Sequence, residues 1–300
     1  MSTGYLSKMD VSKRIAVEVE LRPGRPDDAE VCGAVCHAAF AAIAEQHNFP
    51  PDWSPEASTA FMAAFLARPD IYSVVATVNG RVVGSNFLTE DATIAGVGPV
   101  TVDPAVQDAS IGRRMMRDIL ERAGQRRVVG VRLVQATYHR RSLALYSKLG
   151  FDVRELLVVL QGSCAPVEVP GRTVRAGTTD DVAACDALCT RVHGHDRTAE
   201  VRDSVERGTA LVVEQNGRLT GYATSVGFFG HAVGGSNDDL KALIGSAPEF
   251  PGPGFLLPAR NAELLPWCLN QGLRIVQPMT LMSRGLYNEP ASAFLPSIVY

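Results

Sequence analysis

The chain has 300 residues, of which 46% are hydrophobic, and its 29 Lys and Arg against 32 Asp and Glu give a net charge of −3. This composition excludes general disorder and predicts one large folded domain or two ordinary ones. The slightly acidic balance excludes a general electrostatic attraction to nucleic acid or anionic membranes, so we expect neither as a partner.

The distribution of apolar residues and cysteines excludes further classes. No run approaches the roughly 18 apolar residues of a membrane-spanning helix, and the polar start, Met1 to Arg14, lacks the apolar segment of a secretory signal. We therefore expect a cytoplasmic protein whose cysteines stay reduced. Their spacing fits no zinc site, so we interpret them as core residues and expect no metal. They are Cys32, Cys36, Cys164, Cys185, Cys189 and Cys268.

The chain contains an internal repeat. Three pairs of segments match in the same order, which predicts two copies of one fold. The first pair shares Arg, Gly, Asp-Asp and two cysteines four residues apart, and the second shares an Asn-Gly turn between apolar strands. The pairs are Leu21–Cys36 with Val174–Cys189, Val78–Gly84 with Gln215–Gly221, and, more weakly, His139–Phe151 with Asn261–Leu273.

Apolar periodicity predicts the elements of the first copy. Asp27 and Asp28 open a first helix, where carboxylates are favourable, and Ser54 caps a second one. The order βββαβαβ follows, which is typical of a mixed α/β sheet. The predicted strands are Ile71–Val78, Arg81–Thr89, Ala95–Val102, Val129–Gln135 and Phe151–Gln161, and the helices between them are marked by Ile111 to Leu120 and by Arg140 to Leu149.

A segment rich in Pro and Gly, Gly162–Gly171, separates the two copies and reads as a linker. We therefore expect a first domain over residues 1–161, a linker over 162–171 and a second domain over 172–300.

The segment from Val102 to Arg114 links the third predicted strand to a helix through Pro104 and small residues. Such a turn leaves backbone N–H groups pointing at one place with the helix dipole behind them, which is typical of a phosphate site. The alternative is an ordinary strand-to-helix turn beside a solvated pair, Arg113 and Arg114.

Two motifs resemble the GNAT superfamily of N-acyltransferases. Gln107-x-x-Ser110-x-Gly112 is similar to the Gln/Arg-x-x-Gly-x-Gly/Ala motif with which that family holds the pyrophosphate of acetyl-coenzyme A, although Ser110 replaces a glycine. The segment from His139 to Phe151 resembles the family's Asn-x-x-Ala-x-x-Leu-Tyr-x-Lys-Leu-Gly-Phe, with His139 in place of Asn. The resemblance implies a tandem GNAT protein with two consecutive mixed α/β domains.

The resemblance also implies roles for particular residues. Tyr146 would protonate the leaving thiolate, and the alternative is a tyrosine that only packs under the sheet. No side chain from Thr93 to Thr101 titrates, so we assign the general base to Glu90 by proximity, with Asp91, Glu45 and His47 as alternatives. The implied cofactor-binding residues are Val100, Thr101, Val102, Gln107, Asp108, Ala109, Ser110, Ile111, Gly112, Arg113 and His139.

The second copy departs from the family pattern. It lacks the Gln-x-x-Gly-x-Gly motif, Cys268 stands where Tyr146 would align, and Gly234-Gly235-Ser236 reads as a cap for the helix that follows. We expect a degenerate GNAT-like domain that binds no cofactor, packs on the first copy and forms one wall of the acceptor pocket.

These features together predict an acetyl-coenzyme A-dependent N-acetyltransferase, monomeric or homodimeric, in which an amine of a small molecule or peptide attacks the thioester directly. The alternative is a non-enzymatic module that senses coenzyme A thioesters or a metabolite. Release of free thiol on mixing with acetyl-coenzyme A and an amine distinguishes the two.

Overall fold

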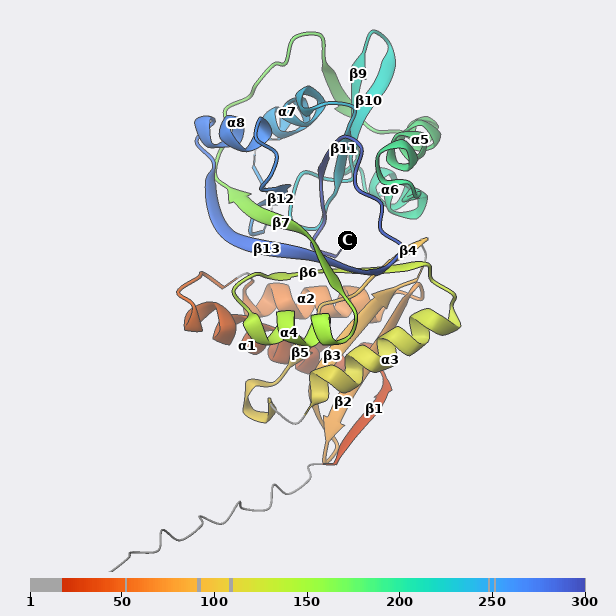
Figure 1. The fold of residues 1–300 in the computed structure, drawn as a ribbon, viewed down its shortest axis with the longest axis vertical. Coiled ribbons are helices and arrows are strands. Elements are labelled where there is room, and N and C mark those ends of the chain that lie inside the picture. The colour runs from red at the N-terminus through yellow and green to blue at the C-terminus, as the bar shows by residue number, and fades with distance from the viewer. Residues whose placement is uncertain are drawn as a thin grey trace, which may run out of the picture.

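The structure, a computed structural model, describes residues 18–51, 53–90, 93–107, 110–247, 249–250 and 252–299. The first half of the chain lies below the second half in Figure 1, and strands from both halves run between them. Three sheets form this mixed α/β fold, with the strand orders β1-β2-β3-β5, β14-β11-β10-β9-β8 and β12-β7-β13-β6-β4. The mixed α/β class expected from the sequence is confirmed.

The first half places helices on both faces of an antiparallel sheet. Val75 and Phe87 pack against the first two helices, whereas Val74 and Leu88 pack against the third, as the alternation of side chains along a strand requires. The elements are β1 (Val19–Pro23), η1 (Pro26–Asp28), α1 (Ala29–Gln46), α2 (Pro55–Leu66), β2 (Ile71–Val78), β3 (Arg81–Thr89), β4 (Ile94–Gly96), β5 (Thr101–Val102), η2 (Pro104–Val106), α3 (Ile111–Gln125), β6 (Gly130–Ala136), α4 (Arg140–Lys148) and β7 (Asp152–Gln161).

The second half repeats this arrangement with shorter elements. Its core includes Cys185, Cys189 and Cys268, and all six cysteines of the chain are buried, as expected, and none is in a disulfide. The elements are β8 (Thr173–Ala176), η3 (Thr179–Asp181), α5 (Val182–His193), α6 (Thr198–Glu206), β9 (Leu211–Gln215), β10 (Arg218–Ala223), β11 (Ala232–Gly234), α7 (Asn237–Ser246), β12 (Phe255–Pro258), α8 (Leu264–Asn270), β13 (Arg274–Gly285) and β14 (Ala293–Leu295).

The repeat in the sequence corresponds to a repeated ion pair. The guanidinium of Arg22 donates two hydrogen bonds of 2.7 Å to the carboxylate of Asp28, and Arg175 makes the same two bonds to Asp181. Each carboxylate also accepts a hydrogen bond from a backbone N–H, that of Arg25 or Thr178, at the start of the following helical turn. The matching residues thus join the first strand of each half to its first helix.

The two halves exchange one strand each, β7 and β13. β13 lies between β6 and β7 and is antiparallel to both, while β7 lies between β12 and β13. The first half therefore inserts β7 between two strands of the second half, and the second half inserts β13 between two strands of the first. This shared sheet crosses the middle of the molecule in Figure 1.

The third predicted strand, Ala95–Val102, is wrong as one element. β4 pairs with β6 in parallel, and β5 pairs with β3 in the other sheet. Between them, Pro99 has no N–H to donate to a strand ladder, so the chain leaves one sheet and joins the next. The two sheets consequently separate at residues 97–100.

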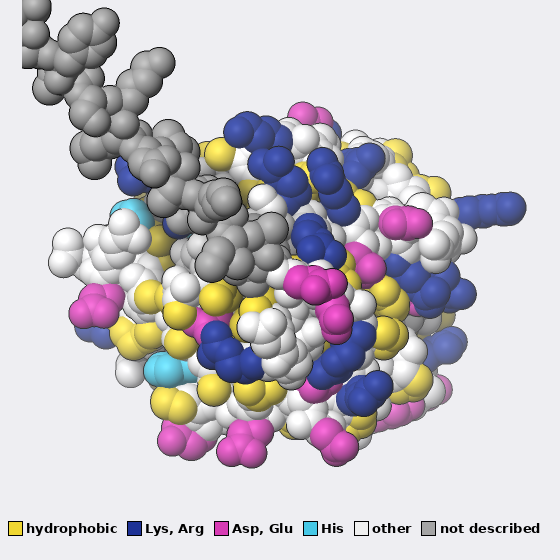
Figure 2. Space-filling view, turned by 90° about the horizontal axis from the view of Figure 1, so that it is seen from below, with side chains coloured by type: hydrophobic (Ala, Val, Ile, Leu, Met, Phe, Trp, Pro, Cys, Tyr) yellow, Lys and Arg dark blue, Asp and Glu magenta, His cyan; other side chains and the backbone are white. Residues whose placement is uncertain are grey.

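The outer face of the first half carries charges of both signs. Arg and Lys side chains lie beside Asp and Glu side chains over much of the face shown in Figure 2. Among the described residues, no helix combines the length and the apolar character that crossing a membrane requires.

We predict that residues 1–165 alone do not form a stable soluble domain. This fragment lacks β12 and β13, so β6 loses one of its two partners and β7 loses both, and unpaired strand edges promote aggregation. Co-expression with residues 166–300 supplies the missing strands and should restore a soluble complex, measured by size-exclusion chromatography. A monomeric 1–165 fragment that unfolds cooperatively would contradict this prediction.

Candidate active site

The first half holds a cavity of ≈ 430 Å³ at the place where the two sheets separate. Residues 97–100 line it on one side, and α1, α3, β6 and α4 contribute further walls. The second half closes it through Phe228, Phe229, Met279, Ile298 and Val299.

The N-terminus of α3 opens into this cavity. The first bond within the helix runs from Arg114 N to Ser110 O at 3.0 Å, so the N–H groups of the three preceding residues are free of intrahelical partners. The first turn contains no acidic residue. A Cβ atom at Gly112 would meet no atom closer than Val102 Cγ2 at 3.7 Å, so the backbone is open to a ligand there. These features suit an anion such as a phosphate.

The turn between β4 and β5 offers one further backbone donor. The N–H of Gly98 bonds to Phe87 O at 3.0 Å, and Pro99 has no N–H. Among the described residues, nothing accepts a hydrogen bond from Val100 N–H. Thr101 lies beside it but is buried, with its hydroxyl 3.0 Å from that of Ser85, and does not line the cavity.

Helix α4 contributes the titratable groups. Burial raises the pKa of Tyr146 to about 12, so the phenol stays protonated at neutral pH. Burial, together with nearby Arg141, lowers the pKa of His139 to about 4, so this ring is neutral. The Nδ1 atom of His139 lies 2.8 Å from the Ser142 hydroxyl. The helix therefore presents an uncharged proton donor and an uncharged imidazole.

Gln135 on β6 is a cavity residue that sequence reasoning missed. Its side chain is 6% exposed, and neither amide atom has a hydrogen-bond partner among the described residues. Leu133, two positions earlier, packs against α3, so Gln135 faces the same side of the sheet. A polar side chain on the same strand face as the apolar Val131 and Leu133 was the signal available in the sequence. Such a buried unpaired amide suits a ligand with its own amide groups.

The candidate general bases lie elsewhere. The carboxylate of Glu90 is 2.5 Å from Arg122 and 3.5 Å from Arg126, and it does not line the cavity. Neither Glu45 nor His47 lines it either, and Asp91 falls outside the described residues. None of the described lining residues carries a carboxylate.

Most of the other predicted site residues converge on the cavity. Asp108 and Ala109 fall outside the described residues, and Thr101 stands behind the lining. Those that line it are Val100, Val102, Gln107, Ser110, Ile111, Gly112, Arg113, His139 and Tyr146.

Comparison with known protein families gives a match in the first half of the chain. Residues 40–151 match the Acetyltransferase (GNAT) family. They form a GNAT domain. The match assigns this segment to the acetyltransferase family. No curated protein is significantly similar to the chain over its sequence.

Solved structures extend the likeness to both halves. A protein of Pyrococcus horikoshii assigned as an acetyltransferase is 19% identical, with a TM-score of 0.71 over 99% of this chain and 97% of that one. A GCN5-related N-acetyltransferase from Sphaerobacter thermophilus is 15% identical, with a TM-score of 0.61 over 90% and 96%. A tandem GNAT protein from the clavulanic acid biosynthesis pathway is 17% identical, with a TM-score of 0.55 over 89% and 98%. The chain therefore has a tandem GNAT fold.

The second half has a hollow at the start of α7, the position equivalent to the α3 N-terminus of the GNAT domain. Asn237, at the start of α7, donates to Glu263 at 2.8 Å and accepts from Asn261 at 2.8 Å. Lys241 also reaches Glu263 at 2.5 Å. The first turn of α7 carries Asp238 and Asp239, which oppose a bound anion. Ser236 and Asp239 form a capping box, as expected of a helix cap.

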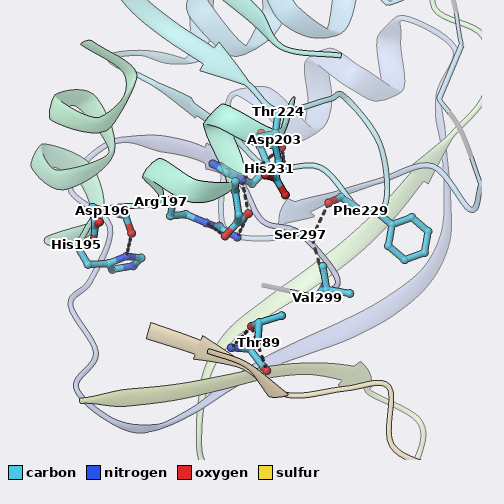
Figure 3. A network of polar contacts seen from close by, with 12 residues as sticks. Thr89, His195, Asp196, Arg197, Asp203, Thr224, Phe229, His231, Ser297 and Val299 are labelled. Carbon is cyan, nitrogen blue, oxygen red and sulfur yellow. Dashed lines mark hydrogen bonds and ion pairs between the residues drawn. The ribbon is translucent and has the colours of Figure 1, made fainter. Parts of the chain in front are cut away.

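A separate polar network lies inside the second half, away from both hollows (Figure 3). Arg197 makes two hydrogen bonds of 2.8 and 2.7 Å to Glu200, whose carboxylate is 3.1 Å from His231 Nδ1. Burial opposes ionisation of Glu200, but Arg197 and His231 outweigh it and hold its pKa at about 2. Within the described residues, no three His, Cys, Asp or Glu side chains gather at a metal site.

We predict that acid destabilises the protein through His195, which borders this network. Burial holds the pKa of His195 at about 4, against 6.5 for an unperturbed ring, so the unfolded chain binds a proton first as the pH falls. The stability contributed by the neutral ring is complete above pH 6.5 and is lost between pH 6.5 and 4. At pH 5 the free energy of unfolding has fallen by about 2 kcal/mol.

Thermal unfolding at pH 7 and pH 5 measures this effect. His195→Asn should reduce the fall in stability between the two values, whereas His47→Asn, which alters a half-exposed ring, should leave it unchanged. An equal fall in His195→Asn and the unaltered protein would refute the assignment.

Proposed function

We propose that the GNAT domain transfers an acetyl group from acetyl-coenzyme A to an amine by direct attack of the amine on the thioester. One observation carries the proposal: a single cavity joins a helix N-terminus with no acid in its first turn, a backbone donor at Val100 with no acceptor among the described residues, and a protonated Tyr146. These groups match the three needs of the reaction, which are an anion site, a carbonyl contact and a proton source.

The cavity fits coenzyme A at one end. The N–H groups of Ile111, Gly112 and Arg113 suit a pyrophosphate, and the open backbone at Gly112 permits its close approach. The unpaired amide of Gln135 suits the amide groups of the cofactor's arm. When bound, acetyl-coenzyme A supplies an activated acetyl group. Val100 N–H is placed to bond the thioester carbonyl, where negative charge develops.

The pKa of Tyr146 is close to that of a thiol buried in the same cavity. An ordinary thiolate is too weak a base to take a proton easily from a phenol whose pKa is about 12. Burial acts on thiols in the same direction, however, as at Cys268, where it raises the pKa to about 12. A thiolate formed in the same apolar cavity is therefore close to Tyr146 in basicity, and the proton can pass to sulfur.

Tyr146→Phe should lower kcat by about 10² or more with little change in cofactor affinity, because it removes the donated proton and keeps most of the packing. Steady-state kinetics at saturating amine across pH measure the effect. Cys268→Ala, at the equivalent position of the second half, should leave kcat unchanged and cost about 1–2 kcal/mol of stability. A normal rate in Tyr146→Phe with chemistry limiting would remove Tyr146 from the mechanism.

Gly112→Ala should weaken coenzyme A binding at least tenfold, because the new methyl group has room among the protein atoms but intrudes where a phosphate must approach. Gly124→Ala is the matched control, since it lies in the same helix with no atom within 4 Å of the added carbon. Calorimetry should give one cofactor per chain. Two bound cofactors, or equal affinities in both variants, would contradict the placement.

A further inference from the structure

The acceptor end of the cavity is built from aromatic rings. We call the five rings that line it there the aromatic box. The ring of Trp53 lies 4.6 Å from Phe61 and 5.4 Å from Phe229, and Phe61 lies 5.1 Å from Phe229, between ring centroids. The box consists of Phe40, Trp53, Phe61, Phe228 and Phe229.

The aromatic box lies across the sheet from the cofactor end. Val134 and Ala136 of β6 pack in the same cluster as Trp53 and Phe228, whereas Leu133 packs towards α3 on the other face. The gap at residues 97–100 joins the two sides, since it lines the same cavity. An acceptor in the box therefore approaches the thioester from the face opposite to the cofactor.

The walls of the box are held by hydrogen bonds. The buried Ser297 hydroxyl donates to Phe229 O at 2.9 Å and accepts from Val299 N at 3.2 Å, which ties two lining segments together (Figure 3). Phe229 is itself 42% exposed and so stands at the mouth. An exposed ring at the entrance of an apolar cavity is typical of a site that closes on an apolar ligand.

The box is poorly suited to a cation. None of the described lining residues carries a carboxylate, and the charged side chains of the lining, Arg113 and Arg141, are positive. His139 is neutral and too weak a base to accept a proton from an alkylammonium at neutral pH. Aromatic faces attract an ammonium, but this attraction is weaker than the cost of burying the charge without a carboxylate. The Trp53 Nε1 atom is buried and has no hydrogen-bond partner among the described residues.

We propose that the acceptor is a weakly basic aromatic amine whose ring occupies the aromatic box and whose nitrogen is already unprotonated at neutral pH. This inference rests on the proposed acetyltransferase function. The amine lone pair forms the new C–N bond as the C–S bond breaks; the nitrogen loses a proton to water, and the sulfur gains one from Tyr146, which solvent reprotonates.

A panel of amines tests the substrate class by thiol release from acetyl-coenzyme A. p-Anisidine should be acetylated at a rate that changes less than twofold between pH 6.5 and 8, because no deprotonation precedes attack. Benzylamine, cyclohexylamine and spermidine, which are protonated in this range, should react at least tenfold more slowly. Preference for any of these three over p-anisidine would overturn the inference, and so would a rate that rises tenfold per pH unit.

Variants of the box test the binding mode. Phe229→Ala and Phe61→Leu should raise KM for p-anisidine about tenfold and leave coenzyme A affinity unchanged. Leu269→Ala is the matched control, because Leu269 is also 42% exposed but lines neither hollow. Unchanged KM in both box variants would refute the placement of the ring.

A binding measurement separates the two proposals. In a Trp267→Phe background, Trp53 is the remaining tryptophan, and p-anisidine should quench its fluorescence in a saturable manner. No saturable quenching overturns the inference. Thiol release with benzylamine or spermidine alone also overturns it and leaves the acetyltransferase function standing. No thiol release with any amine, while coenzyme A binds, overturns the acetyltransferase function together with the inference.

Discussion

The exchange of β7 and β13 between the halves is the constraint on which the rest of the structure depends. β13 bonds along its length to β6 and β7, and β6 and β13 both carry residues that line the cavity. Because β6 must keep its partner β4 on one side and β13 on the other, the gap between β4 and β5 opens at a fixed place. The second half therefore shapes the site without itself needing a cofactor.

The two copies of the fold differ at the N-termini of two equivalent helices, α3 and α7. The ion pair between the first strand and the first helix is the same in both, Arg22 with Asp28 and Arg175 with Asp181. The N-terminus of α3 instead has no acid in its first turn, while that of α7 has two. A few charges at one helix end thus distinguish a half that suits an anion from one that does not.

Local patterns predicted local features well. The repeat, the buried cysteines, the turns at Asn79 and Asn216 and the convergence of the motif residues on one cavity all follow from spacing along the chain. Both of these turn residues adopt positive φ, as hairpin turns of this kind require.

Features that depend on contacts between distant residues could not be predicted from the sequence. Glu90 is held by Arg122, which is 32 residues away, and proximity along the chain could not reveal that pairing. Phe228 and Phe229 reach the cavity only through the packing of the halves. The exchange of β7 and β13 also could not be predicted. The strands are similarly apolar, so hydrophobic periodicity does not determine which of them pair.

The position of β13 also has a consequence for synthesis of the chain. β7 ends at Gln161 but gains its partner only when β13, which ends at Gly285, has emerged. At about 5–20 residues per second, translation leaves the apolar edge of β7 without that partner for roughly 6–25 s. During this interval the nascent first half carries the buried residues Leu157 and Val159 on an open strand, which makes this stretch a natural ligand for ribosome-associated chaperones.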